Sequence, residues 1–392
     1  MAGKRSSVVI AGGGIGGIAT ALALAKYDIE SQVYERRAGF PEEGAGIQIG
    51  PNGTRILSDL GVADVLRAHA AVPDALSARD GSTGQELTRL PLGTWIAERH
   101  GSPYWTAHRK DLHNALRMRA EADPRITLKC GCEIVSFVNE ADGIRAIDAA
   151  GDVIEGQALV CADGLWSDLR KKMGASSVPQ PVGKTAFRSV TPASDLPPEL
   201  TPNAVHIWLA PGAHVVHYPV NAGRDIALVV ITDDTSREAG WERPALAQTV
   251  QDSVRNFSMP LQDLVAKAQD WRRWSLYAMP PLQHWSVGRA TLLGDAAHPV
   301  LPFLAQGAVL ALEDAKMLAC CLAGERHDVA TALKNYEHAR WRRAKRVAET
   351  SRRNGRIYHM NGALALARNA TMRLTRPARM MAGFDWLYGW RL

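Results

Sequence analysis

Three separated groups of residues have the types and spacing that chemistry on a bound nucleotide would need. The first is the glycine-rich run 12–17, followed by Glu35 at the end of the next apolar segment. The second is the run 162–164 (Ala-Asp-Gly), and the third is the run 294–299 (Gly-Asp-Ala-Ala-His-Pro), followed by 306–308 (Gln-Gly-Ala). Each group alone is weak evidence. Their order along most of the chain favours one extended binding site.

The glycine-rich run has the surroundings of a phosphate-binding turn. Residues 7–11 are apolar and β-branched, which predicts a buried strand, and the Ala/Leu-rich residues 18–25 predict a helix. In this strand–turn–helix setting Gly12 permits the turn, Gly14 lets the backbone approach a pyrophosphate, and Gly17 lets the helix pack on the strand. The helix N-terminus offers N–H groups and a positive dipole end to phosphates.

Glu35 adds a second contact to the same site. It ends a predicted strand, 31–34, and lies 18 residues after Gly17, close to the spacing of about 20 expected for a ribose-binding carboxylate. A glycine turn without a ligand is the alternative, and the strand, helix and carboxylate together argue against it. Since Glu35 would repel a 2′-phosphate, the site suits FAD or NAD rather than NADP.

Length and composition limit the class of protein. The chain has 392 residues, of which 46% are hydrophobic and 22% charged, so two lobes or an elaborated α/β domain are expected. The apolar stretches have the length of strands, so no transmembrane helix and no membrane partner is predicted. No hydrophobic signal segment precedes the first strand, which predicts a cytoplasmic protein.

The five cysteines do not have the spacing of a zinc site or of a disulfide framework. Cys130 and Cys132 alternate along a predicted strand, and Cys320-Cys321 falls in a predicted helix. We therefore expect buried reduced thiols and no metal.

The net charge of +6 is concentrated in a basic run at 340–356. This run could bind nucleic acid, but no nucleic-acid-binding module accompanies it. Its helical character, with alanine and valine interspersed, favours a solvated helix face that also attracts anionic substrates.

The predicted elements alternate along the chain between segments of a Rossmann-like domain and segments of an antiparallel-sheet domain. A glycine-rich loop is expected at 44–53, mixed strands at 78–107, an antiparallel sheet within 182–233, and mostly helix from 307 onward. Shorter segments complete the pattern: helices at 54–60, 110–121, 245–254 and 261–268, and strands at 126–129, 133–138, 143–149, 158–162 and 291–293. The fold class predicted is α/β, in which a Rossmann-like FAD-binding domain (1–75, 105–180 and 285–320) is interleaved with an antiparallel-sheet substrate domain (76–104 and 181–284), before a helical C-terminal region (321–392).

Taken together, these motifs resemble the FAD-dependent aromatic hydroxylases of the 4-hydroxybenzoate hydroxylase family over nearly the whole chain. Among them the 3-hydroxybenzoate 6-hydroxylases are most similar, with salicylate hydroxylases and 6-hydroxynicotinate 3-monooxygenases nearby. The matching stretches are 44–52, 103–104, 108–113, 214–219, 294–314 and 386–390. The resemblance implies a single-chain enzyme that binds FAD, takes a hydride from NADH or NADPH, reacts with O2 and hydroxylates an aromatic ring through a flavin hydroperoxide.

Carried over residue by residue, the resemblance implies a set of cofactor contacts. Glu35 would hold the ribose, Arg36 and Ile134 would lie near the adenine, Arg109 would contact the phosphates, and Asp295 would bind the ribityl chain. The full set is Gly12, Gly14, Ile15, Gly17, Glu35, Arg36, Gln48, Arg109, Ile134, Asp163, Asp295, Gln306, Gly307 and Ala308.

The placement of 306–308 in this set has a chemical reason, and the placement of Asp295 has an alternative. Residues 306–308 would begin a helix that faces the N1–C2 edge of the flavin, where the reduced ring is anionic and a helix N-terminus is stabilising. Asp163-Gly164 matches the family motif implicated in FAD and pyridine nucleotide binding. Asp295 in isolation reads as a turn residue that caps the following Ala-Ala-His segment, and the other motifs favour the cofactor role.

Ring hydroxylation requires an electron-rich ring, so the site needs a group that takes or relays a phenol proton. His214 and Tyr218 are the candidates, because residues four apart on a strand point to the same face. His217 points to the opposite face. The resemblance also places a histidine and a tyrosine at these positions near the substrate phenol. Ordinary sheet residues beside a core are the alternative.

The rest of the predicted substrate pocket is Tyr104, Arg188, Pro302 and Phe303. Arg188 would hold a substrate carboxylate or be structural. Pro302 stands where the 3-hydroxybenzoate hydroxylases have glutamine, and Phe303 stands where the salicylate and hydroxynicotinate enzymes often have histidine. Losing a polar side chain changes which substrates fit, so the prediction stops at a phenolic or heteroaromatic carboxylic acid.

Two other functions stay open at this point. A non-hydroxylating FAD oxidoreductase would lack substrate-stimulated oxygen insertion, and a redox-inactive flavoprotein would bind FAD without NADH turnover. A plain NAD dehydrogenase leaves Asp295 and 306–308 unexplained. A homodimer is expected from the resemblance.

Overall fold

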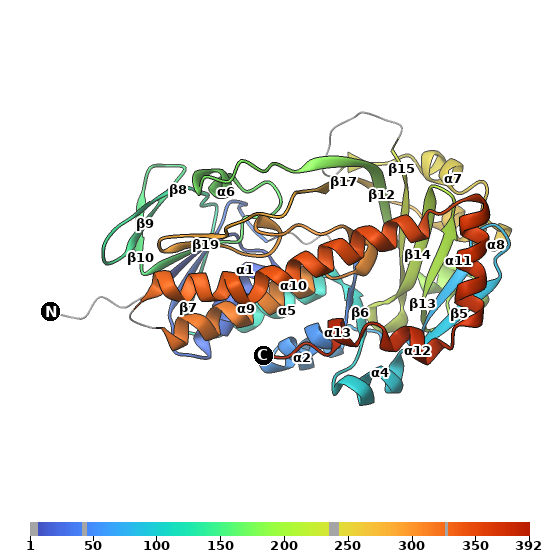
Figure 1. Cartoon of the computed structure of the whole chain (residues 1–392), viewed down its shortest axis with the longest axis horizontal. Helices are drawn as coiled ribbons and strands as arrows, with labels where there is room; N and C mark the ends of the chain where they lie inside the picture. Colours follow the sequence, from blue (N-terminus) through green and yellow to red (C-terminus); the bar gives the residue numbers. More distant parts are fainter. Residues whose placement is uncertain (1–6, 41–44, 235–242, 326–327) are drawn as a thin grey trace.

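The computed structural model describes residues 7–40, 45–234, 243–325 and 328–392. It is an elongated molecule in which a six-stranded sheet lies toward one end and an eight-stranded sheet toward the other (Figure 1). The predicted α/β class, with a Rossmann-like part, a second sheet and a helical C-terminus, is confirmed.

The six-stranded sheet carries the glycine-rich turn. Its strands, in spatial order, are β18 (Ser286–Val287), β19 (Ala290–Leu292), β11 (Ala158–Cys161), β1 (Val8–Ala11), β2 (Ser31–Glu35) and β7 (Ile126–Cys130). The pairings from β19 to β7 are parallel, so their carboxyl ends meet at one edge. Helices α1 (Ile15–Ala25), α5 (Arg109–Glu121) and α9 (Gly307–Gly324) pack with this sheet into the largest apolar core. This places residues 12, 35, 162 and 294, each of which follows or ends a strand, at the same edge.

The eight-stranded sheet forms one wall of the second half. Its strands, in spatial order, are β16 (Arg243–Pro244), β17 (Arg272–Ala278), β12 (Gln180–Pro192), β15 (Asp225–Asp233), β14 (Ala213–Val220), β13 (Ala204–Ala210), β4 (Ala75–Asp80) and β5 (Glu86–Pro91). All pairs are antiparallel except β13 with β4, which is parallel. The division of the chain into domains at the predicted boundaries stays a prediction.

Smaller elements complete the two halves. A three-stranded sheet contains β8 (Ile134–Asn139), β9 (Ile144–Asp148) and β10 (Val153–Gly156), and a ribbon pairs β3 (Gly46–Ile49) with β6 (Trp105–His108). The short helices are α2 (Pro51–Asp59), α3 (Ala63–Arg67), α4 (Gly93–His100), α6 (Asp168–Lys172), α7 (Ala247–Ser253) and α8 (Met259–Lys267).

The C-terminal helices join the two halves. The 30-residue helix α10 (Val329–Tyr358) runs along the molecule from the six-stranded sheet to the eight-stranded sheet (Figure 1). There α11 (Gly362–Leu374) turns across its direction, and α12 (Pro377–Ala382) and α13 (Asp385–Tyr388) lead the chain back to α2.

Three local predictions were wrong. The segment 44–53 is not only a loop, because β3 occupies Gly46–Ile49 and α2 begins at Pro51, a residue suited to the first helical turn. The mixed-strand prediction for 78–107 missed α4, whose end at the left-handed Gly101 (φ +71°) is a recognisable helix stop. Cys130 and Cys132 do not share a strand, because β7 ends at Cys130 and the left-handed Gly131 separates them.

The cysteines are free thiols, but most are not buried. Cys161 is buried in β11, whereas Cys130 is exposed and the other three are intermediate. Cys130 is accessible because β7 is an edge strand.

Candidate active site

The three motif glycines have different environments. Gly12 adopts φ +114°, and a Cβ there would lie 2.3 Å from the carbonyl oxygen of Ala162. A Cβ on Gly17 would lie 1.9 Å from the carbonyl oxygen of Gly12, so helix and strand approach too closely for any side chain. A Cβ on Gly14 would meet no atom within 4 Å. Gly14 therefore borders open space, as a backbone that approaches a ligand must.

That open space is a set of three adjoining hollows, all lined by Gly14. One extends toward Glu35 and Ile134, which we call the nucleotide end. Another extends toward β14 and the start of α9, which we call the ring end. The third contains Arg109 and Asp295 and overlaps the ring end.

At the nucleotide end, Glu35 is fixed by the glycine loop. Its Oε2 accepts a hydrogen bond from the Gly13 N–H and its Oε1 one from the Arg37 N–H, each at 3.0 Å. Arg36, Ile134 and Asp163 line the same hollow. Burial raises the pKa of the Asp163 carboxyl, and its buried Oδ1 has no hydrogen-bond partner in the described part of the chain.

Arg109 and Asp295 face each other in the middle of the site. Both are exposed and line the hollow, although the surrounding protein desolvates them. Burial lowers the pKa of Arg109 and raises that of Asp295, and the charge of each residue opposes the shift of the other. Asp295 lies in the first turn of the 3₁₀ segment Gly294–Ala296, whose N-cap residue is Leu293. A cation and a carboxylate are thus available where a pyrophosphate and a polyol chain would pass.

The ring end is a cavity of about 320 Å³ bounded by a helix N-terminus and a sheet. Gln306 is the N-cap residue of the 18-residue helix α9, and Gly307 and Ala308 form its first turn. All three line the cavity, as do Gln48 from β3 and Pro302. The predicted helix start at 306–308 is therefore aimed into the cavity.

The opposite wall is one face of β14, β15 and β12. His214, Val216 and Tyr218 alternate along β14 and line the cavity. The strand register sets Val216 opposite Val229 on β15, and Val229 opposite Arg188 on β12, so the guanidinium reaches the same face. His217 lies on the other face, where it stacks on His206 at 4.6 Å between ring centroids. The predicted arrangement of His214, His217 and Tyr218 is what the structure shows.

The imidazole of His214 and the phenol of Tyr218 on this wall are held in their neutral forms. Burial lowers the pKa of His214 well below its ordinary 6.5, and the neighbouring His359 and Lys184 lower it further. Burial raises the pKa of Tyr218 to about 12, although Arg188 and a hydrogen bond with Gln48 oppose the shift. At neutral pH the wall therefore presents a neutral imidazole and a neutral phenol beside one cation.

Two predicted pocket residues lie behind the cavity lining. The Tyr104 hydroxyl donates to Gln48 Oε1 at 2.7 Å, so this tyrosine orients a lining residue. Phe303 packs against His214, with 5.6 Å between ring centroids, and lines a separate hollow on the far side. Their roles as substrate contacts stay predictions.

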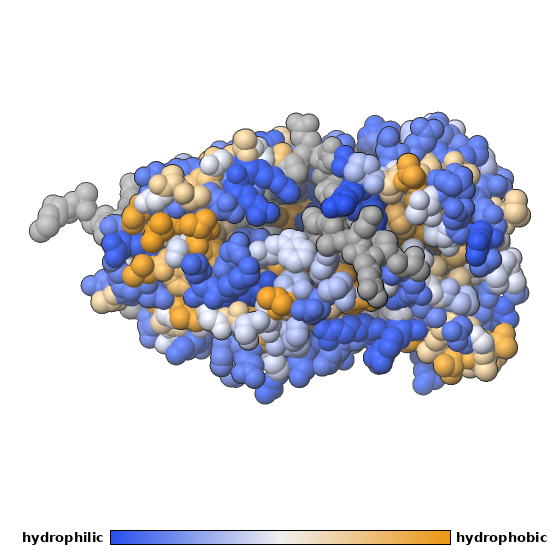
Figure 2. Space-filling model, turned by 90° about the horizontal axis from the view of Figure 1, so that it is seen from above, coloured by the Kyte–Doolittle hydropathy of each residue, from blue (hydrophilic) through white to orange (hydrophobic). Residues whose placement is uncertain are grey.

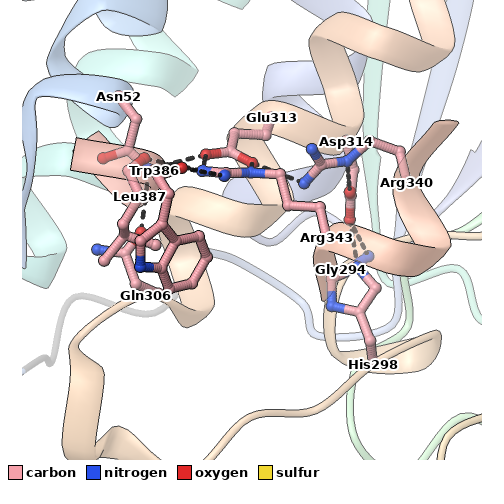
Figure 3. A network of polar contacts seen from close by, with 10 residues as sticks. All are labelled: Asn52, Gly294, His298, Gln306, Glu313, Asp314, Arg340, Arg343, Trp386 and Leu387. Carbon is pink, nitrogen blue, oxygen red and sulfur yellow. Dashed lines mark hydrogen bonds and ion pairs between the residues drawn. The ribbon is translucent and has the colours of Figure 1, made fainter. Parts of the chain in front are cut away.

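A buried charged network lies beneath the ring end (Figure 3). Arg340 on α10 is fully buried, 2.7 Å from Asp314 Oδ1 and 2.8 Å from Glu313 Oε2. Arg343 donates to Glu313 Oε1 at 2.6 Å and to the carbonyl oxygens of Trp386 and Leu387 at 3.0 and 2.9 Å. The interpretation of 340–356 as a solvated face is wrong for these two arginines. The sequence contained a signal for the burial of Arg340, because this residue lies in a helical stripe with Tyr336, Ala344 and Val347, all of which are buried.

This network reaches two predicted cofactor contacts. Asn52 Nδ2 donates to Glu313 Oε1 at 2.7 Å and to Gln306 Oε1 at 3.0 Å, which fixes the helix N-cap (Figure 3). Asp314 Oδ2 accepts from the Gly294 N–H at 3.2 Å, which fixes the turn before Asp295. Burial alone would raise the pKa of Asp314, but His298 and Arg340 hold it at about 2. Sequence reasoning gave Glu313, Asp314 and Arg340 no such positioning role, because only the fold shows which charges meet.

The site as a whole defines a class of protein. A glycine loop with one open position, a carboxylate at the end of β2, an Arg–Asp pair and a helix N-terminus follow one another along a continuous hollow. This sequence of groups fits a dinucleotide whose far end is a planar ring that accumulates negative charge, as FAD does.

Comparison with known proteins identifies the family. Residues 5–351 match the model of the FAD binding domain family, and the chain belongs to it. It is 38% identical to 3-hydroxybenzoate 6-hydroxylase 1 of Aquipseudomonas alcaligenes, covering 98% of each chain. It is 33% identical to 6-hydroxynicotinate 3-monooxygenase of Bordetella bronchiseptica, covering 90% of this chain and 92% of the relative. A solved salicylate hydroxylase–substrate complex shares the fold, with a TM-score of 0.83, 24% identity, and coverage of 99% and 96%.

These findings confirm an FAD-dependent, NAD(P)H- and O2-using aromatic-ring monooxygenase.

Hydrophilic residues predominate on the face seen in Figure 2, with apolar residues in separate groups. In the described ranges, none of the helices combines the length and hydropathy needed to cross a membrane.

Proposed function

We propose that the substrate is a small aromatic or heteroaromatic acid that carries a ring hydroxyl, and that it binds at the ring end. The observation that carries this proposal is the wall on which His214, Tyr218 and Arg188 face the start of α9 across one cavity. The relatives whose names mention hydroxybenzoate and hydroxynicotinate support the same chemical class.

In this proposal each wall residue has one task. Arg188 holds the carboxylate by charge-assisted hydrogen bonds. Tyr218 and His214 contact the ring hydroxyl, and the neutral imidazole of His214 accepts its proton. Val216, Val229 and Ile231 on the same face exclude water from the ring.

The cofactor residues hold the second reactant. Glu35, Arg109 and Asp295 bind the ribose, pyrophosphate and ribityl chain, while the first turn of α9 stabilises negative charge at the ring. When bound, FAD takes a hydride from NADH or NADPH and delivers one oxygen atom of O2 to the substrate ring. The remaining residues of the predicted cofactor set line the hollow around these contacts, except Gly17, which is buried where α1 packs against the glycine loop.

The decisive experiment measures NADH oxidation against hydroxybenzoates, aminobenzoates and hydroxynicotinates, with hydrogen peroxide assayed in parallel. We expect at least one hydroxylated acid to accelerate NADH loss without an equivalent amount of peroxide, and its product fixes the carbon attacked. A yellow protein whose NADH oxidation no acid accelerates would overturn the proposal and favour a non-hydroxylating flavoprotein.

We also propose that the enzyme works in the cytoplasm and that it forms a homodimer, the latter being an expectation that comes from the sequence resemblance. Light scattering of the purified FAD-bound protein tests the dimer, because a monomer mass at micromolar concentration would contradict it.

A further inference from the structure

The wall of the ring end that carries His214 has a second histidine, His359, behind it. His359 follows the last residue of α10, and its Nε2 lies 2.7 Å from Nδ1 of His214, so the two rings share a hydrogen bond. The rings are tilted, with 4.9 Å between centroids. This bond leaves Nε2 as the ring nitrogen with which His214 can meet a ligand in the cavity.

The histidine pair connects two hollows. His214 lines the ring end, whereas His359 lines a separate hollow with Lys184, Asp233 and Arg356. Leu301 borders both hollows, and exposed Arg356 and Asn361 carry the second one to the surface. A route therefore runs from the substrate cavity through two imidazole rings toward solvent.

Neither ring is suited to keep a proton. Burial lowers the pKa of His359 to about 4, helped by Lys184 on β12 and Arg368 on α11 and opposed by Asp233 on β15. Arg352 and Arg356 on α10 also line its hollow. Since burial also depresses the pKa of His214, a proton accepted from a substrate would leave an unfavourable buried cation unless it moved on.

One atom of His359 marks where the proton would leave. Its Nδ1 is buried and has no hydrogen-bond partner among the described residues. Such an atom costs free energy. A different histidine pair, His206 and His217, is stacked rather than hydrogen-bonded to each other and does not line the ring-end cavity.

We propose that His359 is a proton-relay residue that carries the substrate's phenol proton from His214 to the second hollow; this proposal rests on the proposed function. The phenol O–H bond breaks as an N–H bond forms at Nε2 of His214. The N–H bond at Nδ1 of His214 breaks as one forms at Nε2 of His359. The N–H bond at Nδ1 of His359 breaks, and a water molecule that reaches this buried atom from the second hollow takes the proton. The products are a phenolate, two neutral imidazoles and a hydrated proton.

The test follows ionisation of a bound ligand rather than turnover. The FAD-bound protein is mixed in a stopped-flow instrument with 3-hydroxy-4-nitrobenzoate, whose phenolate is coloured, at a pH where the free probe is largely protonated. His359→Gln keeps a side chain that can hydrogen-bond to His214 but cannot relay a proton. We expect a dissociation constant within about twofold of wild type and phenolate formation slowed by about tenfold or more.

Two further variants separate a relay from a structural role. His206→Gln removes a buried histidine outside the route and should ionise the probe at the wild-type rate. His359→Ala should be slow, and added imidazole should restore its rate, which a loss of packing alone would not allow. Wild-type rates in His359→Gln would overturn the relay. A wild-type protein that fails to bind the probe, or that binds it but never forms the phenolate, would instead overturn the proposed ring ionisation and the relay with it.

Discussion

The nucleotide end and the ring end of the site are built in different ways. At the nucleotide end, contacts come from backbone and from residues that directly follow strands of one parallel sheet, such as Gly12, Gly14 and Glu35. At the ring end, side chains from β3, β12, β14 and the start of α9 meet across the molecule. Local geometry therefore fixes the first region, and contacts between distant segments fix the second.

The largest effect expected from breaking the local geometry is at Gly17. Its added Cβ would overlap the Gly12 carbonyl, so Gly17→Ala should lower the free energy of unfolding by about 3 kcal/mol or more and abolish FAD retention. Gly14→Ala is the matched control, because its Cβ meets no atom. We expect it to keep the apoprotein stable within about 1 kcal/mol while FAD binding weakens. Urea unfolding and FAD absorbance measure both, and an unstable Gly14→Ala would contradict the contrast.

The ring end should be sensitive to a residue remote from any ligand. Arg340→Met leaves Glu313 and Asp314 charged and buried without Arg340, which should cost about 3–5 kcal/mol of unfolding free energy. Arg342→Met, on the exposed side of the same helix, should change it by less than about 0.5 kcal/mol. Equal losses in chemical denaturation would show that the network is not what stabilises this region.

Within the ring end, His214→Ala should slow coupled hydroxylation by about 100-fold or divert electrons to peroxide, because the phenol loses its proton acceptor. His217→Gln, on the opposite face of β14, should keep product and peroxide yields close to wild type. Product and peroxide are quantified against NADH consumed. Unchanged coupled turnover in His214→Ala would remove this residue from the mechanism.

At the nucleotide end a single side chain should matter less than the backbone. Glu35→Ala removes the carboxylate that binds the ribose and that accepts from the Gly13 N–H, so FAD should dissociate about tenfold more readily. The FAD-to-protein absorbance ratio after dialysis measures this effect. A fully yellow mutant would count against the ribose role.

The smallest effect expected is a pH dependence that arises outside both regions. Burial lowers the pKa of His206 to about 4 in the folded protein, below its ordinary 6.5. Its neutral form is therefore favoured by folding, and the stability it contributes is complete above pH 6.5 and is lost as pH falls toward 4. At pH 5.5 the loss of unfolding free energy from this histidine amounts to about 1 kcal/mol. His206→Gln should reduce the loss of urea-unfolding stability between pH 7 and 5.5, and an unchanged slope would contradict this assignment.

The same contrast explains what the sequence could predict. The glycine spacing, Glu35 and the start of α9 are short-range signals, and alternation along β14 correctly placed His214 and Tyr218 on one face. His359 lies 145 residues from His214, and no periodicity links them. The burial of Arg340 was readable from its apolar stripe, but its two carboxylate partners were not, because pairing depends on how α9 and α10 pack.

The hydrogen bonds from Arg343 to the carbonyl oxygens of Trp386 and Leu387 bear on how the protein is made. These acceptors lie far downstream of the glycine loop and of Gln306 in the sequence, so they are synthesised later. The nascent chain therefore cannot complete the support beneath Gln306 until Leu387 has emerged from the ribosome. We expect that FAD is captured only after that point, and that cells must keep the cofactor-free nascent chain from aggregating until then.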